Sequence, residues 1–156
     1  SLAMEAGASI EDVQNGLRSF KGVKGRFYQF ISKNKSTVID DSYNANPMSM
    51  KSSIQQLKMF NKDKIFIMGD MGELGDKAVE HHLDIFRFAK ESGIKYLFYM
   101  GNYKSEAKSI FEKDCYTYDN MIDLVNHVKQ LSDSDTVILI KASRFMNFDL
   151  IAEGLK

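Results

Sequence analysis

The chain has 156 residues, of which 44% are hydrophobic, and its 21 basic side chains balance its 21 acidic ones. This length suits one domain with a sizeable core, and the composition excludes a disordered or fibrous chain. A formal net charge of zero provides no general attraction to nucleic acid or to an anionic membrane, although a local basic patch remains compatible with it. No apolar run approaches the roughly 20 residues that span a bilayer, and no signal peptide is evident. The single cysteine cannot form an internal disulfide, which fits a reducing compartment. We therefore expect a cytoplasmic protein. Cys115 itself fits a partly buried apolar filler.

The first forty residues predict a short helix followed by a hairpin. Ser9 can cap the helix, and three apolar residues share one of its faces: Ile10, Val13 and Leu17. Two strand-like runs, residues 27–32 and 36–40, then flank Lys33-Asn34-Lys35. Such a spacing is typical of a hairpin with a short turn.

The rest of the chain alternates helices with apolar strands. Predicted strands cover residues 64–69, 94–101, 115–118 and 136–143. Predicted helices cover 47–61 (marked by Met50, Ile54, Leu57 and Met59), 76–93 (closed by Gly93), 103–113, 121–131 and 148–156. Strands that are apolar on both faces and separated by helices indicate a parallel sheet covered on both sides. We therefore predict an α/β fold, a Rossmann-like three-layer sandwich. Its sheet has about six strands, mostly parallel, with one antiparallel edge strand from the N-terminal hairpin.

Three polar loops follow predicted strands, at residues 40–47 (DDSYNANP), 69–76 (GDMGELGD) and 141–147 (KASRFMN). Ligands of such sheets bind at the carboxyl ends of the strands. Ordinary loop polarity explains any one of these loops alone, but all three together favour a ligand site at this edge of the sheet.

The first loop has more polar groups than a turn requires. Asn46 before Pro47 is typical of a helix start, with Asn as the N-cap. That leaves Asp40, Asp41, Tyr43 and Asn44 unexplained. A carboxylate at a strand end can accept ribose hydroxyls, and an aromatic ring beside an amide can contact a base. The loop is compatible with a nucleotide-like ligand.

Other candidate residues have plain structural alternatives. Asp70 and Glu73 can hold a metal or an ammonium group, or contribute only loop polarity. Arg26 follows two close glycines and can reach a phosphate, or is a solvated surface charge. His81 and His82 are adjacent, so on a helix they point about 100° apart and cannot bind one metal together. We expect no metal site, and no phosphate-binding loop of the Walker type is found in the chain.

Four motifs in this order, GVKGR, DDSYNANPMSM, GDMGELG with a histidine after it, and KASR, resemble the C-terminal domain of the Mur ligase family. The resemblance covers nearly the whole chain and is strongest to the members that add D-alanyl-D-alanine. It implies that residues 1–25 are the tail of a central ATPase domain and residues 26–156 are the C-terminal domain. Ala142 departs from the family pattern, which usually has glycine there.

The resemblance implies an ATP-dependent ligase of peptidoglycan precursor synthesis. In such a ligase, ATP with Mg²⁺ phosphorylates the terminal carboxylate of UDP-MurNAc-tripeptide, and the amine of D-Ala-D-Ala attacks the acyl phosphate. The phosphate loop, the Mg²⁺ ligands and the nucleotide-sugar site belong to the N-terminal and central domains of the family. We therefore expect this chain to close over ATP, to help place the dipeptide, and to be inactive by itself.

The resemblance also implies roles for individual residues. Arg26 corresponds to an arginine that reaches the ATP phosphates, and Asp41 to the aspartate on the ribose. The nucleotide side comprises Asp41, Tyr43, Asn44 and Asn46. The side of the incoming substrate comprises Asp70, Glu73, Lys141, Ser143 and Arg144.

Three alternatives remain open at this point. A response-regulator receiver also has paired acids, a later aspartate and a lysine, which Asp40, Asp41, Asp70 and Lys141 mimic. However, Asp70 ends a strand too early for the phosphorylated aspartate of a receiver. The others are a non-catalytic adapter and the C-terminal domain of another Mur or folylpolyglutamate-type ligase.

Overall fold

A computed structural model describes residue 9 and residues 23–156 of the chain. Apart from Ser9 itself, the helix predicted to start there lies outside the described residues, as does most of the segment expected to belong to a preceding domain. Within the described part, no helix combines the length and the apolar character that a membrane span needs.

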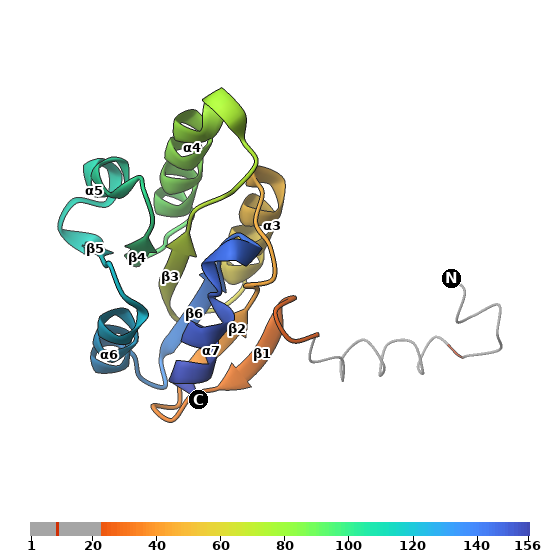
Figure 1. Cartoon of the computed structure of the whole chain (residues 1–156). Helices are drawn as coiled ribbons and strands as arrows, with labels where there is room; N and C mark the ends of the chain where they lie inside the picture. Colours follow the sequence, from red (N-terminus) through yellow and green to blue (C-terminus); the bar gives the residue numbers. More distant parts are fainter. Residues whose placement is uncertain (1–8, 10–22) are drawn as a thin grey trace.

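One six-stranded sheet forms the centre of the fold (Figure 1), in the order β1-β2-β6-β3-β4-β5. The strands are β1 (Tyr28–Ile31), β2 (Thr37–Asp40), β3 (Asp63–Gly69), β4 (Tyr96–Met100), β5 (Cys115–Thr117) and β6 (Thr136–Lys141). β1 pairs antiparallel with β2, and every other neighbouring pair is parallel. The predicted parallel sheet and its antiparallel edge strand are therefore confirmed.

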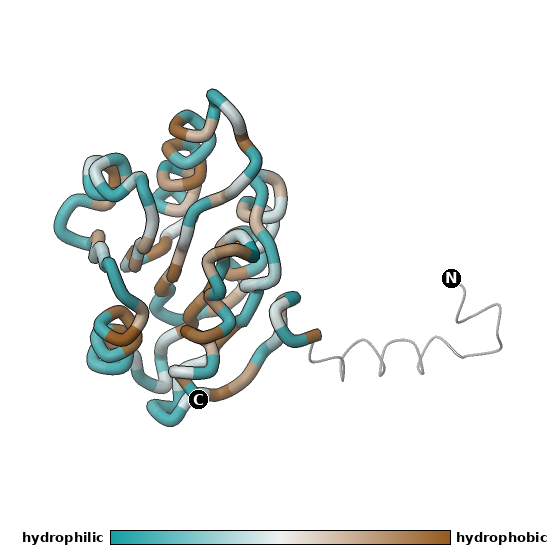
Figure 2. The backbone as a smooth tube through the Cα atoms, viewed as in Figure 1, coloured by the Kyte–Doolittle hydropathy of each residue, from teal (hydrophilic) through white to brown (hydrophobic). Residues whose placement is uncertain are grey.

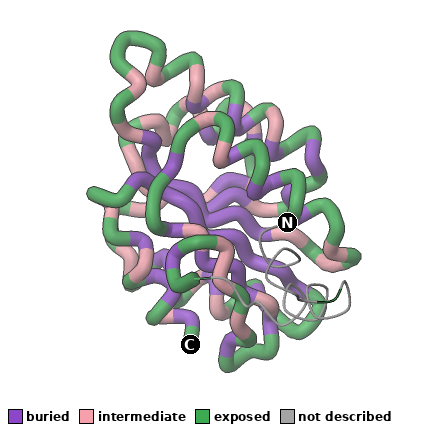
Figure 3. Tube along the Cα trace, turned by 90° about the vertical axis from the view of Figure 1, so that its right-hand side faces the viewer, coloured by how far each residue is buried: buried purple, intermediate pink, exposed green. Residues whose placement is uncertain are grey.

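Helices cover both faces of the sheet. On one face α3 (Pro47–Leu57), α4 (Ala78–Glu91) and α5 (Lys104–Phe111) pack side by side. On the other face lie α6 (Met121–Leu131) and α7 (Asp149–Leu155). Three short 3₁₀ turns follow β3, α5 and β6, respectively at Gly75–Lys77, Glu112–Asp114 and Arg144–Met146. Hydrophobic residues follow the strands and the inward sides of the helices (Figure 2), and the strands are the most buried part of the chain (Figure 3). The predicted three layers are confirmed.

Two helix ends show how local hydrogen bonding sets the boundaries. Gly93 has a φ of +81°, and its N–H donates to the carbonyl of Lys90 while Ile94 N–H donates to that of Ala89. This is a Schellman motif, which confirms Gly93 as the glycine that ends α4. The prediction that the preceding helix reaches Asn61 was wrong, because α3 ends at Leu57 and the chain turns through i→i−3 bonds; Met59 is 86% exposed.

Candidate functional site

The three polar loops meet at one edge of the sheet because β2, β6 and β3 are adjacent, parallel strands. Two adjoining cavities lie there, with volumes of about 450 Å³ and 560 Å³. The first cavity is lined by Gly25, Arg26, Phe27, Asp41, Tyr43, Asn44, Asn46, Ser49, Ser52, Ser53, Gln56 and Lys141. The second cavity is lined by Asn44, Ala45, Asn46, Gly72, Glu73, Leu74, Ser143, Arg144 and Phe145. Asn44 and Asn46 line both, so the two cavities share a wall.

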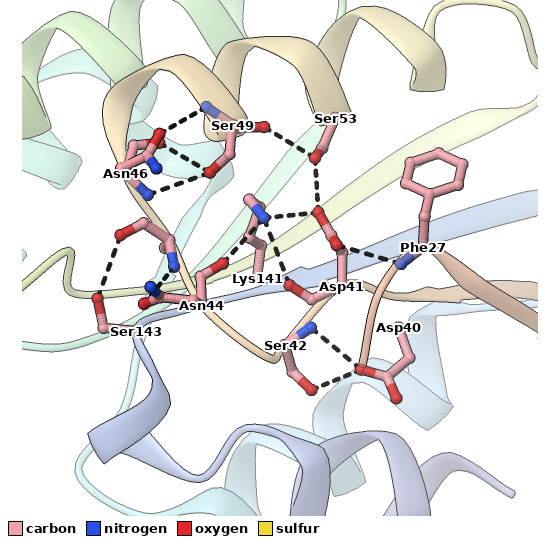
Figure 4. A network of polar contacts seen from close by, with 11 residues as sticks. Phe27, Asp40, Asp41, Ser42, Asn44, Asn46, Ser49, Ser53, Lys141 and Ser143 are labelled. Atoms are coloured by element: carbon pink, nitrogen blue, oxygen red, sulfur yellow. Dashed lines mark hydrogen bonds and ion pairs between the residues drawn. The ribbon is translucent and has the colours of Figure 1, made fainter. Parts of the chain in front are cut away.

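A buried ion pair organises the first cavity (Figure 4). Lys141, at the end of β6, places its Nζ 2.6 Å from Oδ2 of Asp41 and 3.0 Å from the carbonyl oxygen of Asn44, to which it donates. The side chains of Lys141 and Asp41 are only 3% and 16% exposed. Lys141 therefore lies on the side expected for the nucleotide, where its charge holds the 40–47 loop against β6.

The Asp41 carboxylate has further partners in the fold. Oδ1 accepts the backbone N–H of Phe27 at 3.1 Å, and Oδ2 also accepts the hydroxyl of Ser53 at 2.6 Å. Each carboxylate oxygen can accept two hydrogen bonds. Among the described residues only Phe27 donates to Oδ1, which leaves that oxygen with acceptor capacity toward the cavity.

Asp40 joins the segment before β1 to the same loop. Its Oδ2 accepts the N–H of Gly25 at 3.1 Å, and its Oδ1 accepts both the N–H and the hydroxyl of Ser42. Tyr43 N–H donates to the carbonyl of Gly25, whose φ of +78° favours glycine. These bonds fix the backbone that carries Arg26.

The ring of Tyr43 lies between two arginines. The guanidinium carbon of Arg26 is 4.1 Å from the ring centroid and that of Arg144 is 5.8 Å from it, and all three residues are exposed. Cation–π attraction orients both guanidinium groups around this ring, with Arg26 lining the first cavity and Arg144 the second. Two exposed guanidinium groups, each with several N–H donors in one plane, are suited to bind anionic groups.

Asn46 caps α3, as the sequence predicts. Its Oδ1 accepts the N–H of Ser49 at 2.8 Å, and the Ser49 hydroxyl oxygen accepts the N–H of Asn46 at 3.1 Å, with Pro47 at the first helical position. This reciprocal pair is a capping box with Ser in the position usually held by Glu. The side-chain oxygen of Asn46 is therefore engaged, although the residue lines both cavities.

Ser143 connects all three loops. Its hydroxyl donates to the carbonyl of Ala45 at 3.4 Å, and its oxygen accepts the N–H of Gly72 at 2.7 Å. Ser143 is 4% exposed, so the hydroxyl joins the loops together at the wall of the second cavity. Glu73 and Arg144 are exposed at this cavity, and Glu73 has a φ of +60°.

Asp70 is the predicted site residue that the structure separates from both cavities. It is 4% exposed, and its carboxylate accepts bonds from the Tyr99 hydroxyl and from the backbone and side-chain N–H groups of Asn102. Burial, together with this bond, raises the pKa of Tyr99 well above its ordinary value. Gly101 leaves room for the carboxylate, because a Cβ there would lie 2.1 Å from Oδ1 of Asp70.

Sequence reasoning missed several residues that line the first cavity, including Phe27, Ser49, Ser53 and Gln56. The signal for Ser49 was present, because a hydroxyl residue at the third helical position can complete a cap. The face of α3 that lines the cavity carries Ser49, Ser53 and Gln56, which are spaced four and three residues apart, as one face of a helix requires. Phe27 contributes through its backbone N–H, which no side-chain pattern reveals.

Three further observations concern metal ligands, the cysteine and Ala142. Within the described residues there is no group of three or more His, Cys, Asp or Glu side chains that could hold a metal ion. Cys115 is buried, as predicted, and burial raises the pKa of its thiol to about 11. Ala142 is fully buried with its Cβ toward Gly69, and its φ is not positive, so alanine fits this backbone.

The comparisons with known proteins agree with this geometry. The family model of the Mur ligase, glutamate ligase domain, matches residues 25–144. The UDP-N-acetylmuramoyl-tripeptide–D-alanyl-D-alanine ligase of Buchnera aphidicola subsp. Baizongia pistaciae is 35% identical over 99% of this chain and 34% of its own length. The crystal structure of the MurF ligase from Thermotoga maritima in complex with ADP superposes with a TM-score of 0.80. It is 25% identical and aligns over 99% of this chain and 35% of its own.

A MurF structure from Acinetobacter baumannii gives a TM-score of 0.79 at 31% identity, over 98% of this chain and 35% of its own. The chain thus spans about a third of the length of the relatives it matches. These matches set the receiver-domain alternative aside. The chain belongs to the Mur ligase family, within which its described residues form the C-terminal glutamate ligase domain.

Proposed function

We propose that the chain is the C-terminal domain of an ATP-dependent ligase that joins D-Ala-D-Ala to UDP-MurNAc-tripeptide in peptidoglycan precursor synthesis. Residues 1–25 belong, in this proposal, to the preceding central domain. The carboxylate of the tripeptide receives the γ-phosphoryl group of ATP, and the dipeptide amine then displaces phosphate to form the amide bond. The Mg²⁺ ligands lie mainly in the other domains.

The observation that carries the proposal is the pair of adjoining cavities. The residues expected on the nucleotide side (Arg26, Asp41, Tyr43, Asn44 and Asn46) line the first cavity, and three of those expected on the substrate side (Glu73, Ser143 and Arg144) line the second. A shared wall suits a ligase, because the phosphorylated carboxylate and the incoming amine must meet between two binding sites.

The polar groups of the first cavity fit a nucleotide. The free acceptor capacity of Asp41 Oδ1 suits a ribose hydroxyl, and the ion pair with Lys141 orients that carboxylate. Arg26 presents an exposed guanidinium that suits a phosphate, and Tyr43 and Asn44 lie beside it for the base. The related MurF structure from T. maritima was solved in complex with ADP, which supports nucleotide binding by an enzyme of this kind.

The second cavity fits a dipeptide. Leu74, Ala45 and Phe145 supply apolar contacts for small side chains, while the Arg144 guanidinium suits a carboxylate and Glu73 an ammonium group. In this proposal Lys141 and Asp70 act through the fold, since both side chains are engaged inside it.

The proposal is tested by comparing the complete ligase with this 156-residue chain. We expect the complete enzyme, with Mg²⁺, to form ADP from ATP over many turnovers only when UDP-MurNAc-tripeptide and D-Ala-D-Ala are both present, whereas the chain alone forms none. ADP formation by the chain alone would refute the domain assignment. Turnover with glutamate in place of the dipeptide would identify a different ligase of the same family.

A further inference from the structure

Three consecutive backbone N–H groups at the end of β3 are each held by a side chain from a different part of the fold. Asp70 N–H donates to Met146 Sδ at 2.9 Å, Met71 N–H to His82 Nε2 at 2.9 Å, and Gly72 N–H to Ser143 Oγ at 2.7 Å. Ser143 N–H donates back to the carbonyl of Asp70. The backbone that leads into the second cavity is therefore fixed by side chains, and His82 is the titratable one among the three.

The contacts of His82 define its protonation state. A backbone N–H can only donate, so the Nε2 atom that faces Met71 must carry a lone pair. The ring proton then lies on Nδ1, which donates to the carbonyl of Ala78 at 2.7 Å. An imidazolium would instead direct a second N–H at the Met71 N–H across 2.9 Å, and the bond could not persist.

The surroundings of His82 also favour the neutral ring. The residue is completely buried on α4, with the ring of Tyr103 at 4.0 Å between centroids and Phe86 at 6.3 Å. Burial lowers the pKa of His82, and His81 lowers it further, whereas the bond to Ala78 and the charges of Asp70 and Glu106 raise it. Burial dominates, so the folded state binds the ring proton more weakly than the unfolded state does.

We propose that His82 is a positioning residue for the second cavity, because its neutral imidazole fixes the backbone of residues 71–73 and its protonation releases that backbone. The Asp70 carboxylate, whose Oδ1 already accepts from Tyr99 and Asn102, lies 3.8 Å from Nε2 and attracts the protonated ring by its charge. A turn of the ring toward Asp70 abandons the Met71 N–H, so that the backbone leading to Gly72 and Glu73, which line the cavity, loses one of its side-chain anchors and keeps the one from Ser143. The assignment of this cavity to the incoming amine rests on the proposed function, but the hydrogen bonding does not.

The consequence for pH follows from the lowered pKa. Above the ordinary histidine value of about 6.5 both states are neutral and the contribution of His82 to stability is complete. As the pH falls below that value, the unfolded ring takes up a proton that the folded ring resists. The free energy of unfolding therefore decreases with falling pH until the folded ring is protonated as well, and the cavity loop is released there.

Two substitutions separate the roles of the two ring nitrogens. His82→Asn keeps a donor near the position of Nδ1 and removes the acceptor at Nε2. His82→Gln places an amide oxygen near the position of Nε2 and does not titrate. His81→Asn is the matched control on the same helix, because the His81 side chain makes no hydrogen bond with the described residues and lines neither cavity.

The first measurement uses nitrogen-15 NMR on the 156-residue chain. We expect the Nδ1–H tautomer at neutral pH and a scalar coupling across the Met71 N–H···Nε2 bond, both lost on acidification. In H82N, shift changes should concentrate in residues 70–74, and in H82Q they should be small. An Nε2–H tautomer or an imidazolium at neutral pH would overturn the proposal, as would changes in H82N spread evenly over the core.

The second measurement uses the complete ligase. We expect H82N to raise KM for D-Ala-D-Ala about tenfold, the loss that follows when a buried donor is left without its acceptor. KM for ATP should stay within about twofold, H82Q should recover most of the loss, and H81N should match the wild type. The ratio of wild-type to H82Q kcat/KM for the dipeptide should fall as the pH drops through the pKa of the folded ring, which lies below the ordinary histidine value of about 6.5. This ratio cancels ionisation of the dipeptide itself.

Equal effects of H82N and H82Q, or a joint rise of both KM values, would show that His82 only fills the core. If the complete enzyme does not use D-Ala-D-Ala at all, the proposed function fails, and the NMR measurement decides the role of His82 independently.

Discussion

Individual residues carry two kinds of signal, and only one of them can be predicted from a single chain. The chemical types at the strand ends are visible in the sequence, and they correctly locate the edge at which Asp41, Asn46 and Ser143 gather. The partner that each charge selects is not visible. Lys141 ion-pairs with Asp41 100 positions away, and Asp70 turns toward Asn102, because each buried charge needs the nearest compensating group in three dimensions. The roles predicted for these residues in binding remain predictions.

The Asp41–Lys141 pair gives a test at this scale. Lys141→Met preserves the volume and length of the side chain but leaves a mostly buried carboxylate without its counter-ion. We expect the free energy of unfolding of the 156-residue chain to fall by about 3 kcal/mol, measured by urea denaturation. Adding Asp41→Asn should recover part of the loss, since no uncompensated charge then remains.

The matched control is Lys95→Met. This substitution breaks the ion pair with Asp63, the first residue of β3, at the end of the sheet away from the cavities. Both of its side chains are about half exposed, so water compensates them and the loss should be much smaller. Equal losses at the two positions would show that the Lys141 pair has no special weight in the fold.

At the scale of helices and strands, periodicity predicts most of the structure. The apolar runs predicted the central strands and the order of helices between them, because buried parallel strands must be apolar on both faces. The partly exposed, antiparallel β1 was predicted from the hairpin pattern instead. The end of α3 was less predictable, because an apolar residue follows soon after the last helical one. The apolar Met59 suggests a helix that continues past Leu57, but the helix has already ended, since the chain must turn to enter β3 at Asp63.

Asn46 provides the test for an element, because it both caps α3 and lines the two cavities. Asn46→Ala removes the acceptor for Ser49 N–H and should lower the free energy of unfolding by about 1 kcal/mol. Asn46→Asp keeps an N-cap acceptor and should retain the wild-type stability. If the first cavity binds ATP, the added negative charge should nevertheless raise KM for ATP in the complete enzyme.

The comparison of the two variants separates capping from binding. A loss of stability in both would mean that the cap requires the amide group itself. A KM for ATP that is unchanged in Asn46→Asp would argue against a phosphate or nucleotide near this helix start.

At the scale of the whole molecule, both cavities lie at one edge of the sheet, and the exposed Arg26 lines the first of them. The chain spans about a third of its relatives, so two thirds of a related enzyme lies outside it. An arginine that contacts a phosphate held by another domain acts only when the domains are closed. Such a residue should influence turnover more than folding.

Arg26→Lys tests this separation of roles. Lysine keeps the charge but loses the planar fork that binds a phosphate through two parallel hydrogen bonds, and it stacks less well on Tyr43. We expect kcat of the complete ligase to fall about tenfold or more, equivalent to about 1.4 kcal/mol in the activation barrier. An exposed substitution away from the core usually changes stability by less than about 0.5 kcal/mol, so Tm of the 156-residue chain should move by no more than about 2 °C. Measuring kcat and Tm for the same substitution decides between the two readings of Arg26. A clear drop in Tm with normal turnover would identify a structural charge, because the stack on Tyr43 would then be the contact that matters.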